Sequence, residues 1–344
     1  MLRAVIGFDH IAKNVQNSWL ANCGYPLTLS SGAAGKPLII NADGALTTIS
    51  GVSSGQQTQS VLDLSPYMAT SGFTTVTVGV RVKVLEGVPT GPFSYLGSAV
   101  NGSDASWVYT WALAGSPPNA TGSEFFVEYE LNLAGNVVNL YVDGVLAVAN
   151  VPMTAAVSNA IKTGKLVFFF AHTGQNMSHV YSVKDIYLLD NMAGDGFTKR
   201  LGSRRSVPVV PDAAVGAGWV TTDSSPLLTP LLVSPEVANP AFLTAPVNKT
   251  PLKVSLKGNV PAGGTVEAVM MMVSGKVDIN GAVTKVRVED GAAVGADKAL
   301  AVDFTTTLKY GLPAGIFIKH PSGVAWTNAN LDTTNLVLSP DTVG

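Results

Sequence analysis

One pair of acidic side chains in this sequence could do hydrolytic chemistry. Glu128 and Glu130 lie two residues apart in the run Ser-Glu-Phe-Phe-Val-Glu-Tyr-Glu-Leu (123–131). Because side chains alternate along a strand, both glutamates would project from one face, with Glu124 on the same face. Two carboxyl groups about 5–5.5 Å apart are what retaining hydrolysis of a glycosidic bond requires. The spacing therefore indicates one candidate catalytic pair.

A simpler interpretation explains the same residues. Four apolar residues, spaced two apart from Phe125 to Leu131, alternate with the acidic positions. This is the pattern of a half-buried strand, on whose polar face glutamate is ordinary. Three of the four glutamate-face positions are acidic, and Phe126 is the apolar exception. We therefore expect Glu128 and Glu130 to be structural and the chain to have no catalytic residues.

Candidate metal ligands are scattered along the chain. Calcium prefers carboxylate and carbonyl oxygens, and the candidate aspartates are Asp9, Asp143, Asp185 and Asp190. Asp143 precedes Gly144 in a tight-turn signal that backbone geometry alone would select. The histidines lack the spacing of metal ligands; they are His10, His172, His179 and His320. We expect no metal or cofactor site, with a structural Ca²⁺ as the minor alternative. Cys23 is the only cysteine, so no intrachain disulfide can form.

Basic residues gather in one short stretch, Lys199, Arg200, Arg204 and Arg205. No stacking aromatics are interleaved with them beyond Phe197, and the net charge of the chain is −2. Nucleic-acid binding usually shows both a basic balance and such aromatics. We expect these side chains to meet an acidic patch of a partner subunit, or to be solvated, rather than to contact nucleic acid.

The elements that would position these residues are short strands. Residues 73–84 and 124–149 alternate most cleanly, and the second range reads as three strands with Asp143-Gly144 in a hairpin turn. Residues 155–161 predict one or two helical turns. Many short strands separated by turns predict a sandwich over residues 1–195. The other expected strands are 2–8, 36–41, 60–64, 93–96, 106–113, 166–170 and 181–189.

The rest of the chain divides into an arm and a second β region. Eight prolines between Val207 and Pro251 exclude a helix or a central strand, so residues 196–250 are expected to form an extended arm. Residues 251–344 predict a small sandwich or barrel of about five to seven strands. Within them, Met270-Met271-Met272 reads as a core strand, with an oligomer seam as the sharper alternative.

Composition bears on how the surface is used. Charged residues are 13% and hydrophobic residues 47% of the chain, and the charged share is about half the usual value. We expect either a surface that lies against neighbouring subunits or simply a Gly/Ala/Val-rich β protein. The N-terminus lacks the features of a signal peptide. No apolar run reaches the ~18 residues of a membrane span, so we expect no membrane insertion.

Two resemblances follow from quoted motifs. Leu140-Tyr141-Val142-Asp143-Gly144-Val145 resembles the sheet centre of concanavalin A-like (laminin-G-like) jelly rolls, which occur in lectins, glycanases, adhesion modules and virus particles. Residues 183–190, then 197–202, then Trp219, and finally Gly323-Val324-Ala325-Trp326-Thr327 resemble in their order tailed-bacteriophage virion proteins with such an N-terminal domain. Lys184-Asp185 stands where this resemblance would place two acidic residues.

These observations predict an all-β protein: an N-terminal concanavalin A-like jelly roll (1–195), a Pro-rich extended arm (196–250) and a smaller C-terminal β-sandwich or barrel (251–344). The resemblance implies a non-enzymatic structural component of a tailed-phage virion, assembled in the host cytoplasm, in the capsid, tail, baseplate or a fibre. The expected partners are other virion proteins and further copies of the chain, for example in a trimer. The alternatives are an adhesin that binds a host-surface glycan and, third, a glycanase that uses Glu128 and Glu130.

Overall fold

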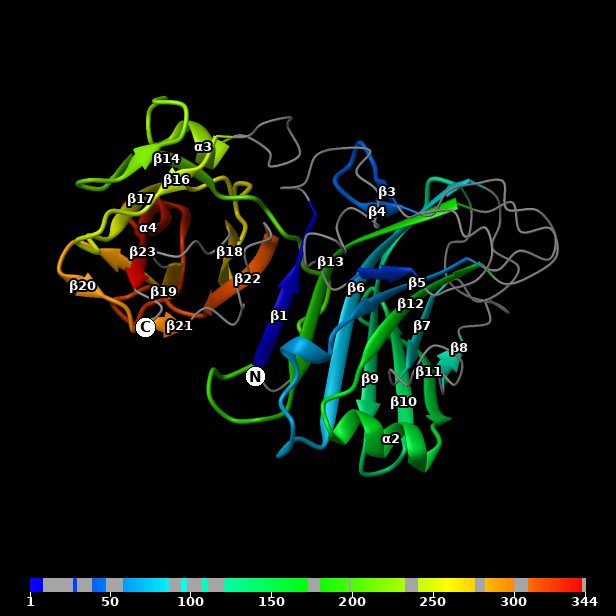
Figure 1. Cartoon of the computed structure of the whole chain (residues 1–344). Helices are drawn as coiled ribbons and strands as arrows, with labels where there is room; N and C mark the ends of the chain where they lie inside the picture. The colour runs from blue at the N-terminus through cyan, green and yellow to red at the C-terminus, as the bar shows by residue number, and fades with distance from the viewer. Residues whose placement is uncertain are drawn as a thin grey trace. The chain divides into compact units, whose positions relative to one another are not determined.

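The fold is known from a computed structural model, which describes most of the chain. The described residues are 1–8, 27–29, 39–47, 58–86, 94–97, 107–110, 121–172, 180–197, 199–232, 241–275, 282–299 and 309–341. They form two compact units, with the boundary between Ser206 and Val207. Both units are built from antiparallel strands (Figure 1), so the predicted all-β class is confirmed.

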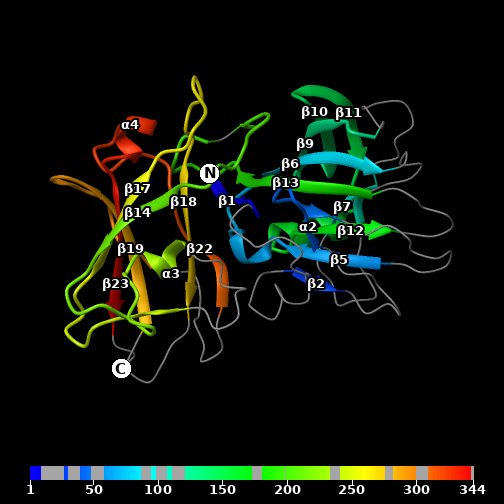
Figure 2. The same cartoon turned by 90° about the horizontal axis from the view of Figure 1, so that it is seen from above.

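The first unit is a sandwich of two antiparallel sheets, which lie one above the other in Figure 2. The larger sheet has the order β11-β10-β9-β6-β13-β4-β3, with β1 also paired to β13. Its strands are β1 (Leu2–Ile6), β3 (Ile39–Ile40), β4 (Leu46–Thr47), β6 (Thr75–Glu86), β9 (Glu124–Asn132), β10 (Val137–Val142), β11 (Val145–Pro152) and β13 (Val180–Asp190).

The smaller sheet has the order β2-β5-β12-β7-β8. Its strands are β2 (Leu27–Leu29), β5 (Thr58–Asp63), β7 (Ser94–Gly97), β8 (Trp107–Thr110) and β12 (Val167–His172). A 3₁₀ turn η1 (Ser65–Tyr67) and helix α2 (Ala155–Lys162) complete the unit. Thr154 caps α2 by accepting a hydrogen bond from the N–H of Val157, as helix N-termini require. The expected hairpins, the helical turns and the central position of β12 are all found.

Period-2 alternation sets the inner face of the large sheet. The valines of β6 from Val76 to Val84, and Val127, Tyr129 and Leu131 of β9, are all buried. The intervening residues point to the other face of the sheet, which carries Arg81 and Glu128 and is described below. Alternation thus assigns every residue of β6 and β9 to a face, as the sequence predicts.

Strand β13 departs from this regularity at two points, of which the second involves Asp185. Two residues, Asp185 and Ile186, stand opposite a single position of β6, because the register shifts between Lys184 and Tyr187. Asp185 takes a positive φ of 53° at this bulge. A bulge redirects side chains, and here Asp185 and Tyr187 both make their polar contacts on the same side of the sheet.

The second unit is built around a six-stranded sheet, order β14-β17-β23-β19-β20, with β21 also paired to β19. The strands are β14 (Val210–Val215), β17 (Leu252–Lys257), β19 (Ala282–Asp290), β20 (Ala293–Val294), β21 (Lys298–Ala299) and β23 (Asn335–Asp341). Two ribbons accompany the sheet: β15 (Val220–Thr221) with β16 (Leu243–Thr244), and β18 (Val269–Gly275) with β22 (Lys309–Phe317). The helical turns are α3 (Thr229–Leu232) and α4 (Asn328–Leu331).

Two tryptophans anchor the core of this unit. Trp219 and Trp326 are buried together with Met271 and Phe317. Their indole N–H groups donate to the carbonyls of Thr250 and Phe317, both at 2.8 Å, so neither polar atom is left unsatisfied. Met271 therefore fits the core-strand interpretation of the methionine run.

The segment 196–250 differs from the expected arm because it is divided between the units. Residues 199–206 belong to the first unit, and β14 pairs with β17 in the second. Proline is tolerated on an edge strand, and β14 with Pro211 is such an edge. Across the described residues the longest helix is α2 with eight residues, and none could span a membrane.

Gly79 on β6 provides a test of this packing. A Cβ atom at Gly79 would lie 2.1 Å from Cε1 of Tyr187, so Gly79→Ala must displace the Tyr187 ring. We expect a loss of about 1–3 kcal/mol in the free energy of unfolding, the usual cost of overpacking. Urea denaturation measures it. Gly135→Ala is the control, since its nearest neighbour is a flexible side chain at 3.3 Å, and an equal loss there would contradict the explanation.

Candidate functional site

Glu128 is the more buried of the two candidate glutamates, with 1% of its surface exposed. Its Oε1 accepts hydrogen bonds from the hydroxyl of Tyr187 and from the N–H of Gly202, the latter at 2.8 Å. Its Oε2 accepts from Nη1 of Arg200 at 2.7 Å. Both carboxylate oxygens are therefore engaged. A buried carboxylate requires such compensation, because an unpaired buried charge is costly.

Two of these donors come from residues 199–206, which we call the anchor segment. A second set of contacts holds its other end. Arg81 donates from Nη2 to the carbonyl oxygen of Arg204 at 2.7 Å and to Oγ of Ser203 at 3.1 Å. The N–H of Ser206 donates to Oδ1 of Asp185 at 2.8 Å. The anchor segment is therefore fixed to the polar face of the large sheet by hydrogen bonds and ion pairs.

Arg81 joins these contacts to the bulge of β13. Its Nε donates to Oδ2 of Asp185 at 2.7 Å, and its Nη1 lies 3.3 Å from Oε1 of Glu124. Both Arg81 and Asp185 are buried. The guanidinium also lies 5.4 Å from the centre of the Phe126 ring, within cation–π range. Asp185 is thus a structural ion-pair partner in this chain.

Arg200 lies between three groups of the sheet. Its guanidinium carbon is 3.3 Å from the centre of the Tyr141 ring. Its Nε lies 3.8 Å from Oε2 of Glu130, whose other oxygen accepts from Nδ2 of Asn139 at 3.1 Å. Glu128 and Glu130 therefore share one cation from their own chain, and the acidic patch expected for the basic residues is intramolecular in the case of Arg200.

Tyr187 is held as a hydrogen-bond donor. Burial raises the pKa of its hydroxyl well above the ordinary value, and the neighbouring Glu128 charge raises it further. The hydroxyl consequently stays protonated at working pH and donates to Glu128, while it accepts from the N–H of Leu201 at 3.1 Å. The phenol links the sheet to the anchor segment.

The other candidate ligands also have protein partners where they are described. Oδ1 of Asp143 accepts from the N–H of Phe126 at 2.8 Å, and Asp143 takes a positive φ of 46° in the hairpin turn. Asp190 pairs with Nε of Arg3 at 2.6 Å. Asp9 lies outside the described residues. Among the residues that the structure describes, no three His, Cys, Asp or Glu side chains converge as a metal site.

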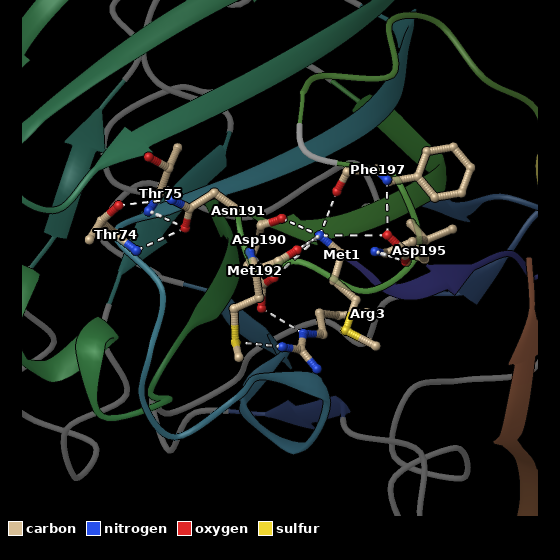
Figure 3. Close-up of polar contacts among 10 residues, drawn as sticks. Met1, Arg3, Thr74, Thr75, Asp190, Asn191, Met192, Asp195 and Phe197 are labelled. Atoms are coloured by element: carbon tan, nitrogen blue, oxygen red, sulfur yellow. Dashed lines mark hydrogen bonds and ion pairs between the residues drawn. The ribbon is translucent and has the colours of Figure 1, made fainter.

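Figure 3 shows the polar contacts that join Asp190, at the end of β13, to the start of β1. The ammonium group of Met1 bonds to the carbonyl oxygens of Asp190, Met192 and Phe197. The N–H of Leu2 donates to Oδ2 of Asp195 at 2.7 Å. These bonds fasten the turn after β13 to β1, immediately before the anchor segment begins.

Sequence reasoning did not connect His320 with its neighbours. The ring is buried against Trp326, and Nδ1 lies 2.7 Å from Oγ of Ser322. Nε2 lies 3.0 Å from Oδ2 of Asp290 but outside hydrogen-bond geometry. The N–H of Ser322 also donates to Nδ1, so a local turn explains the Ser-His contact. The side chain of His172, and all of His10 and His179, lie outside the described residues.

Comparisons with known proteins identify no family for this chain. No family model matches the chain, and no curated protein matches it. Among solved structures, a sialidase aligns at 12% identity over 54% of this chain and 18% of its own, with a TM-score of 0.35. The alignment therefore covers less than a fifth of the sialidase.

Two further solved structures cover more of their own length. One, from work on endo-acting O-glycanases that members of the human gut microbiota express to initiate mucin breakdown, has 10% identity over 55% of this chain and 99% of its own, with a TM-score of 0.36. Alginate lyase A1-II′ of polysaccharide lyase family 7 has 12% identity over 44% and 82%, with a TM-score of 0.28. All three names describe proteins that act on glycans, but likeness at this level says nothing of function here.

Arg81 provides the test of the anchor. Arg81→Ala leaves the Asp185 carboxylate buried without a cation and removes the contacts to Ser203 and Arg204. We expect a loss of about 3–5 kcal/mol in the free energy of unfolding, as for other broken buried ion pairs. We also expect faster tryptic cleavage within residues 199–206.

Lys83 is the matched control on the same strand. Its ammonium pairs with Asp43 at 3.1 Å, but both side chains are exposed. Such pairs contribute about 0–1 kcal/mol, so Lys83→Ala should unfold nearly as the parent does. Similar losses for the two variants in urea denaturation would show that the anchor does not depend on the buried pair.

Proposed function

We propose that this chain is a non-enzymatic structural subunit of a tailed-phage virion, which works by self-assembly and by docking on other virion proteins. One observation carries the non-enzymatic part of the proposal. The one carboxylate pair with catalytic spacing is used to fix the anchor segment, through Arg200 and the N–H of Gly202. A substrate would have to displace the chain's own Arg200 to reach Glu128.

The virion part is supported by what the motif residues do. The residues that carry the resemblance to tailed-phage virion proteins include Asp185 and Tyr187 on β13, and Arg200 and Gly202 in the anchor segment. All four make the contacts that hold this segment. Trp219 and Trp326, from the same resemblance, lie in the core of the second unit. The motif residues therefore stabilise the fold, as expected of a non-enzymatic structural subunit.

The surface also fits a subunit that meets neighbours. Charged residues are 13% of the chain, and several large apolar side chains are exposed: Val145 and Leu146 on β11, Val215 on β14, Val220 on β15, and Val247. Charge depletion and apolar side chains are features of the central part of protein interfaces. The proposal accounts for their exposure in a single chain.

Particle composition tests the proposal. The chain should be found by mass spectrometry in tailed-phage particles purified by density gradient, and an antibody against it should label intact particles. The purified chain should leave bacterial polysaccharides intact, and Glu130→Gln should change neither result. Absence from purified particles would overturn the virion role.

The alternatives have their own outcomes in the same experiment. Depolymerisation of a polysaccharide that is lost in Glu130→Gln would replace the structural role by a glycanase. Saturable binding of the intact chain to a glycan, without turnover, would favour the carbohydrate-binding adhesin.

A further inference from the structure

The last residues of the anchor segment lie at the junction of the two compact units. Arg204, Arg205 and Ser206 directly precede the boundary between Ser206 and Val207. Residues 199–209 contain no helix or strand, and irregular connecting segments are where proteolytic nicking concentrates. Trypsin-like serine proteases select an arginine through an acidic pocket that takes its side chain. The junction therefore carries two candidate arginines for such a protease.

The two arginines differ in exposure. Arg205 has 71% of its side chain exposed, and its only polar contact in the described part of the chain is to Glu124, at 3.8 Å between Nη2 and Oε1. This separation is beyond hydrogen-bond distance. Arg204 is half-buried, and its Nη1 donates to the carbonyl oxygen of Ser203 at 3.0 Å. Arg205 is therefore the side chain that can enter the pocket of another protein.

The backbone is held on both sides of Arg205. The carbonyl oxygen of Arg204 accepts from Arg81 at 2.7 Å, and the N–H of Ser206 donates to Oδ1 of Asp185 at 2.8 Å. Among the described residues, no backbone hydrogen bond is found for the N–H or the carbonyl oxygen of Arg205. A serine protease attacks the carbonyl carbon of the residue in its pocket. The carbonyl that must react thus has no competing donor, while the residues on either side stay fixed to the sheet.

We propose that the Arg205–Ser206 peptide bond is a processing site for an arginine-specific, trypsin-like serine protease, and that the cut leaves both units folded. Water adds across the bond, so that Arg205 ends in a carboxylate and Ser206 begins with an ammonium group. Neither residue belongs to the buried core of its surroundings. This inference goes beyond the proposed function, because it concerns how the chain is processed and not how it assembles.

The new ammonium group lies beside an anion. The N–H of Ser206 is already 2.8 Å from Oδ1 of Asp185, whose side chain has 3% of its surface exposed. Cleavage turns this neutral donor into a cationic one, and charge-assisted hydrogen bonds are roughly twice as strong as neutral ones. The cut chain therefore keeps and strengthens the bond that holds Ser206 to the bulge of β13.

Limited digestion of the full chain with trypsin tests the site. We expect the fragment that begins Ser-Val-Pro-Val (206–209) to appear at least tenfold faster than fragments cut after Lys199, Arg200 or Arg204. Arg205→Gln should abolish this fragment, and the matched control Arg204→Gln should retain it. N-terminal sequencing and mass spectrometry identify each product. Cuts after Arg200 or Arg204 that come first or equally fast in the parent chain would overturn the assignment.

Acylation tests the ion pair of the cut chain. An ammonium group held by Asp185 is protected from acetic anhydride, because only the deprotonated amine reacts. We expect the α-amine of Ser206 to be acetylated at least tenfold more slowly in the folded cut chain than in the same chain in urea, as measured by mass spectrometry. The exposed Lys199 is the internal control and should react similarly in both states. Equal rates at Ser206 would overturn the ion pair.

The chain from its natural source decides whether the site is used. Chain isolated from the cells or particles that make it should include the fragment that begins at Ser206, and recovery of only the uncut chain would overturn the processing. The proposed function has a separate readout. A cut chain that is absent from purified particles would overturn the virion role and support the processing site.

Discussion

The buried carboxylate of Glu128 is the constraint on which the first unit depends. A charge on the polar face of β9 would ordinarily be solvated, but Glu128 is covered and therefore needs donors from its own chain. Tyr187 can reach it only because Gly79 leaves room for the ring and because the bulge of β13 redirects the strand. Arg200 and Gly202 supply the remaining donors. One carboxylate thus links three separated parts of the chain, β9, β13 and the anchor segment.

The edge strands β11 and β14 bear on how copies of the chain can associate through their sheets. The long edge strand of the first unit, β11, has no charged residue, yet its pairing with β10 is interrupted twice, between Val138 and Leu140 and between Leu140 and Tyr141. The edge strand β14 of the second unit carries Pro211 and Asp212. Bulges, prolines and charges on edge strands all oppose pairing with another strand. Neither of these two edges therefore favours extension of its sheet by a further strand.

Prediction from the sequence succeeded where a local pattern decides the outcome. Alternation located β6 and the three strands β9 to β11, and α2 lies where the sequence predicts one or two helical turns. The pattern could not give the environment of Glu128, because alternation assigns a side chain to a face and does not say what covers that face. The covering residue lies 72 positions later. The cluster of basic residues around Arg200 was the available signal, but its partner could be assigned only once both were placed.

The surroundings of Glu128 and Glu130 bear on whether the pair is catalytic or structural. Two glutamates on one strand face are equally suited to cleave a glycoside and to hold a guanidinium, since both tasks need carboxylate oxygens at short spacing. What distinguishes the tasks is access. Both oxygens of Glu128 accept hydrogen bonds from the protein, so a substrate would compete with these donors for the carboxylate. In this fold, the spacing that first indicates catalysis places both glutamates beside the guanidinium of Arg200.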